Sequence, residues 1–185
     1  DIKTWTLEEY KMILKTLKEK LPADVSPMSL YAKNNQGDTW NLAYLRMFGT
    51  PFFGPDGKLV ANDDATVKAL TLLDEFRKAG YTNTGAETLT SNDVLALFQN
   101  QKTAINFVNS VLLTNIQKDM ADGKIGKFDL RLANIPGEKA PASFTYVTGA
   151  CVFNTGNEAK MAMAKKFVQF FSTNAELVKA SKNGI

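Results

Sequence analysis

The stretch that decides the fold is residues 90–123, TSNDVLALFQNQKTAINFVNSVLLTNIQKDMADG. Thr90 and Asp93 have the spacing of a helix N-terminal cap, and the apolar residues that follow recur at helical spacing. Residues 103–108 then form a short apolar run, which predicts a buried strand. Asn109-Ser110 has the residue types that begin a second helix. A helix, a strand and a helix in succession predict an α/β fold.

The same alternation continues on both sides of this stretch. Thr6 and Glu9 form a capping box, in which the hydroxyl accepts from the backbone N–H three residues on and the carboxylate reaches back. Asn62 or Asp63 is expected to cap a central helix, which Gly80 ends. We expect helices over 7–20, 39–48, 63–79, 158–171 and 174–182, strands over 28–32, 128–135 and 144–153, a hairpin around 55–57, and a second capping box at 173–176.

Composition excludes several classes of site. The 185 residues include no histidine and a single cysteine, Cys151. A Ser-His-Asp triad, an HExxH zinc site, a cysteine-rich zinc site and an internal disulfide are therefore impossible. Gly-rich phosphate loops and the GxSxG elbow do not occur. We therefore expect no enzyme, no metal and no cofactor, and we expect Cys151, which lies in an apolar run, to be buried.

The charge pattern argues against a nucleic-acid partner. The formal net charge is +3, and lysines dispersed along helices far outnumber arginines, which are the residues that nucleic-acid sites favour. No run approaches the ~18 apolar residues of a membrane span. The sequence opens at Asp1 without the pattern of a secretory leader, so we expect it to be a fragment of a longer protein.

Three loops at predicted strand ends carry amides, hydroxyls and aromatic rings. Neutral polar groups can pair with sugar hydroxyls, and a ring can stack on the apolar face of a pyranose. Open α/β sheets bind ligands at the carboxyl ends of their strands. Turn formation or core packing also explains each residue taken singly, but the convergence of three such loops favours a binding site. The candidate ligand-binding residues are Asn34, Asn35, Gln36, Asp38, Trp40, Asn109, Ser110 and Tyr146.

Several segments, in order, resemble a known family. The sequence is similar to the extracellular solute-binding proteins of ABC transporters, specifically carbohydrate-binding family 1 with the type II periplasmic-binding-protein fold. The segments that carry the resemblance are TWTLEEY at 4–10, GDTW at 37–40, DGKLVAND at 56–63, FQNQKTAI at 98–105, IPG at 135–137, and 149–153 with 157–171.

The sequence also departs from the family pattern. Gln101 stands where the family has a glycine, and Val111 stands where it usually has a sugar-stacking tryptophan. The family's first ~100 residues, which form lobe 1, have no counterpart here. The resemblance implies that residues 1–152 are lobe 2, a mixed sheet flanked by helices, and that residues 153–185 are a C-terminal helical tail that returns to lobe 1.

The resemblance implies a ligand-capturing component of an ABC importer. A sugar or oligosaccharide would bind between two lobes, and a membrane permease would recognise the closed form. The location would be extracytoplasmic, either periplasmic or as a lipoprotein anchored at the outer face of the cell membrane. The alternatives are the same fold binding a polyamine, peptide or oxyanion, or a small interaction domain outside transport. Apolar stripes on the tail helices predict packing on the chain's own lobe or self-association with a neighbouring chain.

Overall fold

The computed structural model describes residues 3–33, 43–49, 53–60, 63–138 and 149–180. The chain forms two compact units, one over residues 1–144 and the other over residues 145–185. The elements of the first unit are α1 (Leu7–Lys20), β1 (Ser26–Met28), α3 (Asp64–Lys78), α4 (Ser91–Gln99), β2 (Thr103–Ile105) and α5 (Ser110–Ala121). Those of the second are α6 (Glu158–Thr173) and α7 (Ala175–Ala180).

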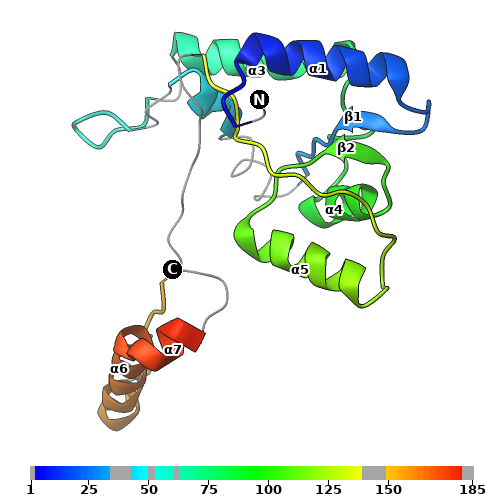
Figure 1. Cartoon of the computed structure of the whole chain (residues 1–185). Helices are drawn as coiled ribbons and strands as arrows, with labels where there is room; N and C mark the ends of the chain where they lie inside the picture. Colours follow the sequence, from blue (N-terminus) through cyan, green and yellow to red (C-terminus); the bar gives the residue numbers. More distant parts are fainter. Residues whose placement is uncertain (1–2, 34–42, 50–52, 61–62, 139–148, 181–185) are drawn as a thin grey trace. The chain divides into compact units, whose positions relative to one another are not determined.

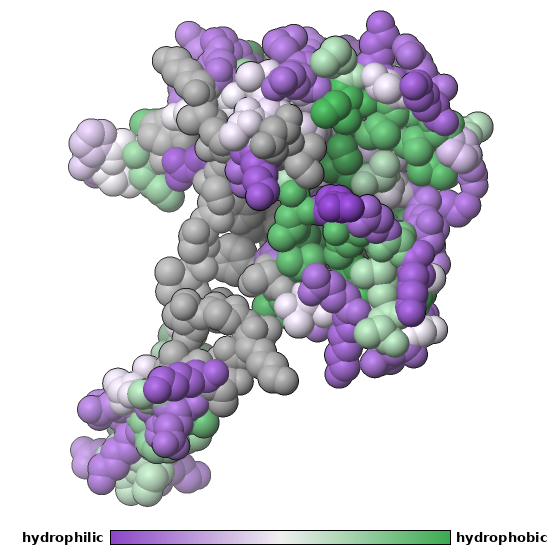
Figure 2. Space-filling model, viewed as in Figure 1, coloured by the Kyte–Doolittle hydropathy of each residue, from purple (hydrophilic) through white to green (hydrophobic). Residues whose placement is uncertain are grey.

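The first unit is layered around a small parallel sheet. Strands β1 and β2 pair in parallel, with Ser26 opposite Thr103 and Met28 opposite Ile105. In Figure 1, α1 and α3 lie on one side of the two strands, and α4 and α5 lie on the other. Figure 2 shows hydrophobic side chains gathered in the middle of this face of the unit, with hydrophilic ones around its rim. The α/β fold class is confirmed.

Local signals determine the helix ends. In α1 the capping box is complete, because Glu9 N–H donates to Thr6 Oγ1 at 3.2 Å and Thr6 N–H donates to Glu9 Oε2 at 2.6 Å. Of the two residues proposed to cap α3, Asp63 is the one that does so, and it accepts from Thr66 N–H at 2.7 Å. A helix also covers residues 43–47, within the range expected at 39–48. The hairpin around 55–57 is present, with Phe53 bridged to Leu59.

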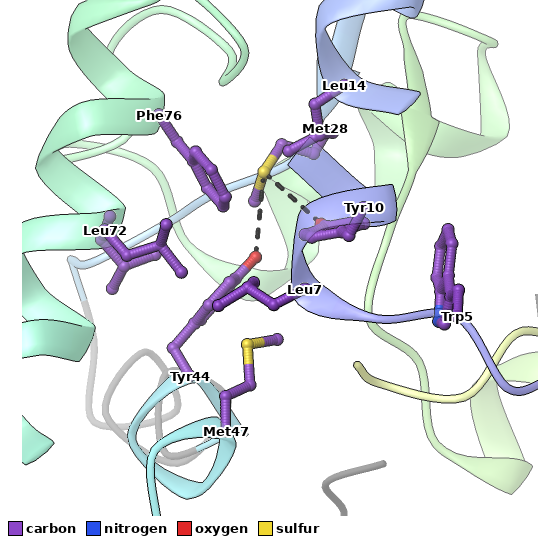
Figure 3. Packing of buried hydrophobic residues seen from close by; sticks show 10 residues of the cluster. Trp5, Leu7, Tyr10, Leu14, Met28, Tyr44, Met47, Leu72 and Phe76 are labelled. Carbon is purple, nitrogen blue, oxygen red and sulfur yellow. Dashed lines mark hydrogen bonds between the residues drawn. The ribbon is translucent and has the colours of Figure 1, made fainter. Parts of the chain in front are cut away.

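The core lies between α1, β1, α3 and the helix at 43–47. Leu14 is fully buried and Tyr10 is 1% exposed, because both point from the apolar face of α1 into this layer. A fully buried side chain of this kind contributes roughly 1.5–3 kcal/mol relative to an exposed one. The cluster consists of Trp5, Leu7, Tyr10, Leu14, Met28, Tyr44, Met47, Leu72, Leu73 and Phe76, most of which Figure 3 labels.

Several local expectations are wrong, and the strand expected at 28–32 lies instead at Ser26–Met28. Residues 128–134 form no strand, and Trp5 Nε1–H instead donates to the Asn134 carbonyl at 2.6 Å, which takes up a group that a ladder would use. Of the strand expected at 144–153, residues 144–148 lie outside the described residues and 149–153 form no strand. Cys151 is exposed rather than buried. The proposed box at 173–176 is not formed, because Asn174 Oδ1 caps α7 by accepting from Glu176 and Leu177 N–H.

Candidate functional site

The carboxyl ends of β1 and β2 meet at one edge of the sheet. Parallel pairing places them there, and the ladder extends one step further because Ser29 N–H donates to the Ile105 carbonyl at 2.9 Å. On the other side of β1, Met28 forms an isolated parallel bridge with Thr82. Three chain segments therefore leave the sheet together, at 29–33, 82–84 and 106–109. Open α/β sheets bind ligands at this kind of edge.

Short polar side chains link these segments to one another. Ser29 Oγ–H donates to Asn106 Oδ1 across the two strands. Asn83 Oδ1 accepts from Leu30 N–H at 2.7 Å, which joins the third segment to the first. All of these side chains are neutral amides or hydroxyls, which can both donate and accept hydrogen bonds. The edge can therefore present polar groups of both kinds to a neutral ligand.

The candidate residues at the start of α5 lie at this edge. Asn109 is the N-cap of α5, and its Oδ1 accepts from Leu112 N–H at 2.8 Å. Ser110 is the first residue of the helix, as expected. The Asn109 Oδ1 is therefore engaged by the backbone of the first turn of α5.

Aromatic rings line the chain next to these polar groups. Phe107 is half-buried, and its ring centroid lies 5.1 Å from that of Tyr44 at a tilt of 48°. Tyr31 follows β1 and is 7% exposed. Phe107 lies two residues beyond the end of β2 and two residues before Asn109. The Phe107 ring therefore packs against the core cluster, although its backbone lies in the segment that leaves β2.

Two buried tyrosines beneath the edge stay neutral. Tyr10 and Tyr44 both donate from their hydroxyls to Met28 Sδ, at 3.7 and 3.8 Å (Figure 3). Burial raises the pKa of Tyr10 to about 12 and raises that of Tyr44 well above its ordinary value. Neither phenol is therefore an acid or base for chemistry near neutral pH. Their role is to join α1, β1 and the helix at 43–47.

The structure places some candidates and not others. Asn109 and Ser110 stand at the edge, whereas Asn34, Asn35, Gln36, Asp38, Trp40 and Tyr146 lie outside the described residues. The chain leading to Asn34 is held, because Lys33 N–H donates to the Leu89 carbonyl at 3.1 Å. Among the described residues, no group of three or more Asp, Glu or Cys side chains could hold a metal ion. Among the same residues, no helix has both the length and the apolar character needed to cross a membrane.

Sequence reasoning missed Ser29 and Asn83 as residues of this edge. Asn-Thr-Gly at 83–85 is an ordinary turn sequence, which by itself does not indicate a site. The signal that could have found both is their position, since each directly follows residues that pair at the end of the short sheet.

Comparison with known proteins places this geometry in a family. The profile of the family described as bacterial extracellular solute-binding protein matches residues 1–177. The chain belongs to this family. Its members are binding proteins of the cell exterior, so the resemblance to the carbohydrate-binding solute-binding proteins is confirmed, and the membership indicates binding rather than catalysis.

Solved structures share the fold. Maltose-bound T. maritima MalE3 superposes with a TM-score of 0.69 at 19% identity, over 97% of this chain and 46% of that chain. A putative oligosaccharide periplasmic-binding protein from Synechococcus sp. MITs9220 gives a TM-score of 0.60 at 10% identity, over 96% and 43%. The chain thus spans less than half the length of these two proteins. Among curated proteins, none matches the sequence.

Proposed function

We propose that this chain captures a carbohydrate at the carboxyl edge of its sheet, as part of the solute-binding component of an ABC importer. The observation that carries the proposal is the convergence of Ser29, Asn106 and the N-terminus of α5 at one edge, where Asn83 Oδ1 accepts from Leu30 N–H. Hydroxyls and amides that both donate and accept match the hydroxyl groups of a sugar. The maltose in the MalE3 structure supports the same ligand class.

The site proposed here is one half of a two-lobed clamp. The neighbouring structures are about twice as long as this chain, so a second lobe would supply further contacts. In this proposal Asn34, Asn35, Gln36 and Asp38 bond to sugar hydroxyls, and Trp40 or Tyr146 stacks on the ring. Closure of the two lobes would create the surface that a membrane permease recognises. The location that follows is extracytoplasmic, with or without a lipid anchor.

Weak binding is expected for one lobe alone. Each lost hydrogen bond costs ~0.5–1.5 kcal/mol net, and ~1.4 kcal/mol is tenfold in affinity. We therefore expect the 185-residue chain to bind maltose or maltotriose with a Kd of roughly 1 mM, which corresponds to about −4.1 kcal/mol. Amide chemical-shift changes in NMR titrations would measure this affinity and would show whether residues 29–33 and 106–110 respond.

Matched variants and ligands separate the alternatives. Asp38→Asn is expected to weaken sugar binding without lowering the melting temperature, because it removes a charge-assisted hydrogen bond and keeps the side-chain shape. Trp40→Ala weakens binding at unchanged melting temperature if the ring stacks on the sugar, and it lowers the melting temperature if the ring is core. Spermidine, a short peptide and inorganic phosphate are the comparison ligands. Saturable binding of one of them without any sugar response would replace the proposal, and turnover of a glycan would overturn the non-enzymatic function.

A further inference from the structure

On the side of β1 away from β2, the outer side, main-chain hydrogen bonds give way to a side-chain hydrogen bond at Asn83. Met28 N–H donates to the Tyr81 carbonyl at 2.9 Å, and Met28 bridges Thr82 in parallel. In a continuing parallel ladder the next donor, Leu30 N–H, would bond to the main-chain carbonyl of residue 83. It bonds instead to the side-chain Oδ1 of Asn83, at 2.7 Å. One amide side chain thus takes the place of a strand carbonyl.

Because a side-chain oxygen replaces the main-chain carbonyl, the chain can turn away from the sheet after Asn83 while Leu30 keeps a hydrogen bond. The chain turns after Asn83, with Gly85 at φ 73° and Thr88 N–H donating to the Gly85 carbonyl at 2.9 Å. It then returns to β1, because Ala32 N–H donates to the Ala86 carbonyl at 2.9 Å. The Asn83 side chain thus holds Leu30 on this side of the chain, between the bonds that Met28 and Ala32 make.

The Asn83 bond is also sheltered from water. Asn83 is 7% exposed and Leu30 is only partly exposed. A backbone N–H that loses its partner in such a place costs more than the bond itself contributes, because water cannot replace the acceptor. On the inner side, Ser29 is fixed by the Ile105 carbonyl and by Asn106. Ser29 is therefore held from the β2 side, whereas Leu30, Ala32 and Lys33 are held from the other side, where Asn83 supplies the contact to Leu30.

We infer that Asn83 is a positioning residue for ligand binding, one that fixes the carboxyl end of β1 and the chain entering Asn34. The inference rests on the proposed function, because the edge that Asn83 sets is the proposed sugar site. Asn83 is assigned no contact with the ligand. It acts through Leu30 and the backbone that follows, so its loss should move the edge without unfolding the unit.

The test compares three variants of the 185-residue chain. Asn83→Leu removes the acceptor at similar size, and Asn83→Asp keeps an acceptor at the same place. Asn100→Ala is the control, because Asn100 Nδ2 also bonds to backbone, the Ala96 carbonyl at 2.8 Å, but at the end of α4. Amide hydrogen exchange at Leu30 reports the local bond, and exchange at Tyr10 and Leu14 in α1 reports global unfolding. NMR titration with maltose reports affinity.

In Asn83→Leu we expect Leu30 to exchange at least tenfold faster while Tyr10 and Leu14 keep their rates, and maltose affinity to fall about tenfold. Asn83→Asp should restore both readouts, and Asn100→Ala should change neither.

Unchanged Leu30 exchange in Asn83→Leu would overturn the inference. The inference would also be overturned if maltose affinity fell only in variants whose α1 amides exchange faster, because that result would indicate global destabilisation. If the unmodified chain binds no sugar, the proposed function fails, and the exchange of Leu30 still decides whether Asn83 holds the edge.

Discussion

Two amphipathic helices of similar length, α1 and α6, have different surroundings. Both begin with a side-chain cap, Thr6 for α1 and Asn157 for α6. In α1 the apolar face is buried in the core of its unit, whereas α6 has no buried residue. Phe167 is 65% exposed and its ring stacks on that of Phe171 rather than in a core. Periodicity therefore predicts a helix and its apolar face, but not the partner of that face.

Truncating one apolar side chain on each helix tests this comparison most strongly. Leu14→Ala should destabilise the first unit by ~2–5 kcal/mol, because it opens a cavity at a fully buried position. Phe167→Ala should change the free energy of unfolding by no more than about 0.5 kcal/mol, as expected for an exposed side chain. Urea unfolding followed by circular dichroism measures both.

Equal costs for the two substitutions would break the comparison, because Phe167 would then lie in an interface. The dependence of the unfolding midpoint on chain concentration distinguishes two possible partners of Phe167, a second copy of the chain and the chain's own first unit. An unfolding midpoint that rises with chain concentration indicates a second copy, as the predicted self-association requires. A costly Phe167→Ala with a concentration-independent midpoint indicates packing against the chain's own first unit.

The ends of helices provide a second, smaller test. Helix α4 ends in a Schellman arrangement, in which Gln101 N–H donates to the Phe98 carbonyl at 2.9 Å and Lys102 N–H to the Leu97 carbonyl at 2.8 Å. Gln101 has φ 57°, a left-handed conformation that a residue with a Cβ adopts at a cost. Helix α6 ends at Asn174 with φ −74° and ψ 108°, which costs nothing of this kind.

Gln101→Gly should therefore stabilise the first unit by about 1 kcal/mol, measured as a higher urea midpoint at unchanged slope. Gly80→Ala is the matched control, because Gly80 has φ 69° and its substitution should destabilise. A loss of stability in Gln101→Gly would mean that the Gln101 side chain makes contacts worth more than the strain.

The smallest expected effect is a difference in acid sensitivity between the two caps. Hydrogen bonds from the Thr6 backbone and hydroxyl lower the pKa of Glu9 from its ordinary 4.5. A lowered folded-state pKa stabilises the fold fully above 4.5, and this stabilisation is lost as pH falls through the lower folded value. The corresponding position of α6 is Lys160, so that cap has no acidic partner.

Glu9→Gln should flatten the fall in stability below pH 4.5 while leaving stability near pH 7 slightly reduced. The measurement is thermal unfolding of α1's unit from pH 7 to pH 3. An acid limb identical to that of the unmodified chain would show that the Glu9 contact is too exposed to matter.

Local features were predictable from sequence, and non-local ones were not. The capping boxes at Thr6 and Thr90 use neighbouring residues only, so their spacing was sufficient. A strand needs a partner from elsewhere in the chain, which is why residues 128–134 alternate like a strand yet form none. At 173–176 the sequence offers two residues that could cap α7, Thr173 and Asn174. Asn174 is the cap, because the Thr173 hydroxyl already donates to the Gln169 carbonyl.

The candidate site divides in the same way. The helix start at Asn109-Ser110 was predictable because it is a local signal, and ligand binding by these two residues stays a prediction. Asn83 and Ser29 gain their roles from strands distant in sequence, and no short motif marks such a position. The residues of the 34–40 segment remain predictions.

The parallel pairing of β1 with β2 also constrains how the chain folds. Ser26 pairs with Thr103, so a loop that includes α3 and α4 must close before any hydrogen bond between the two strands can form. Contacts of such long sequence separation slow folding, whereas helices such as α1 and α6 form from neighbours alone. During synthesis the carboxyl edge of the sheet cannot form until Asn106 has left the ribosome. The proposed ligand edge is therefore a late product of folding, and a variant that slows pairing of β2 should delay formation of this edge more than formation of the helices.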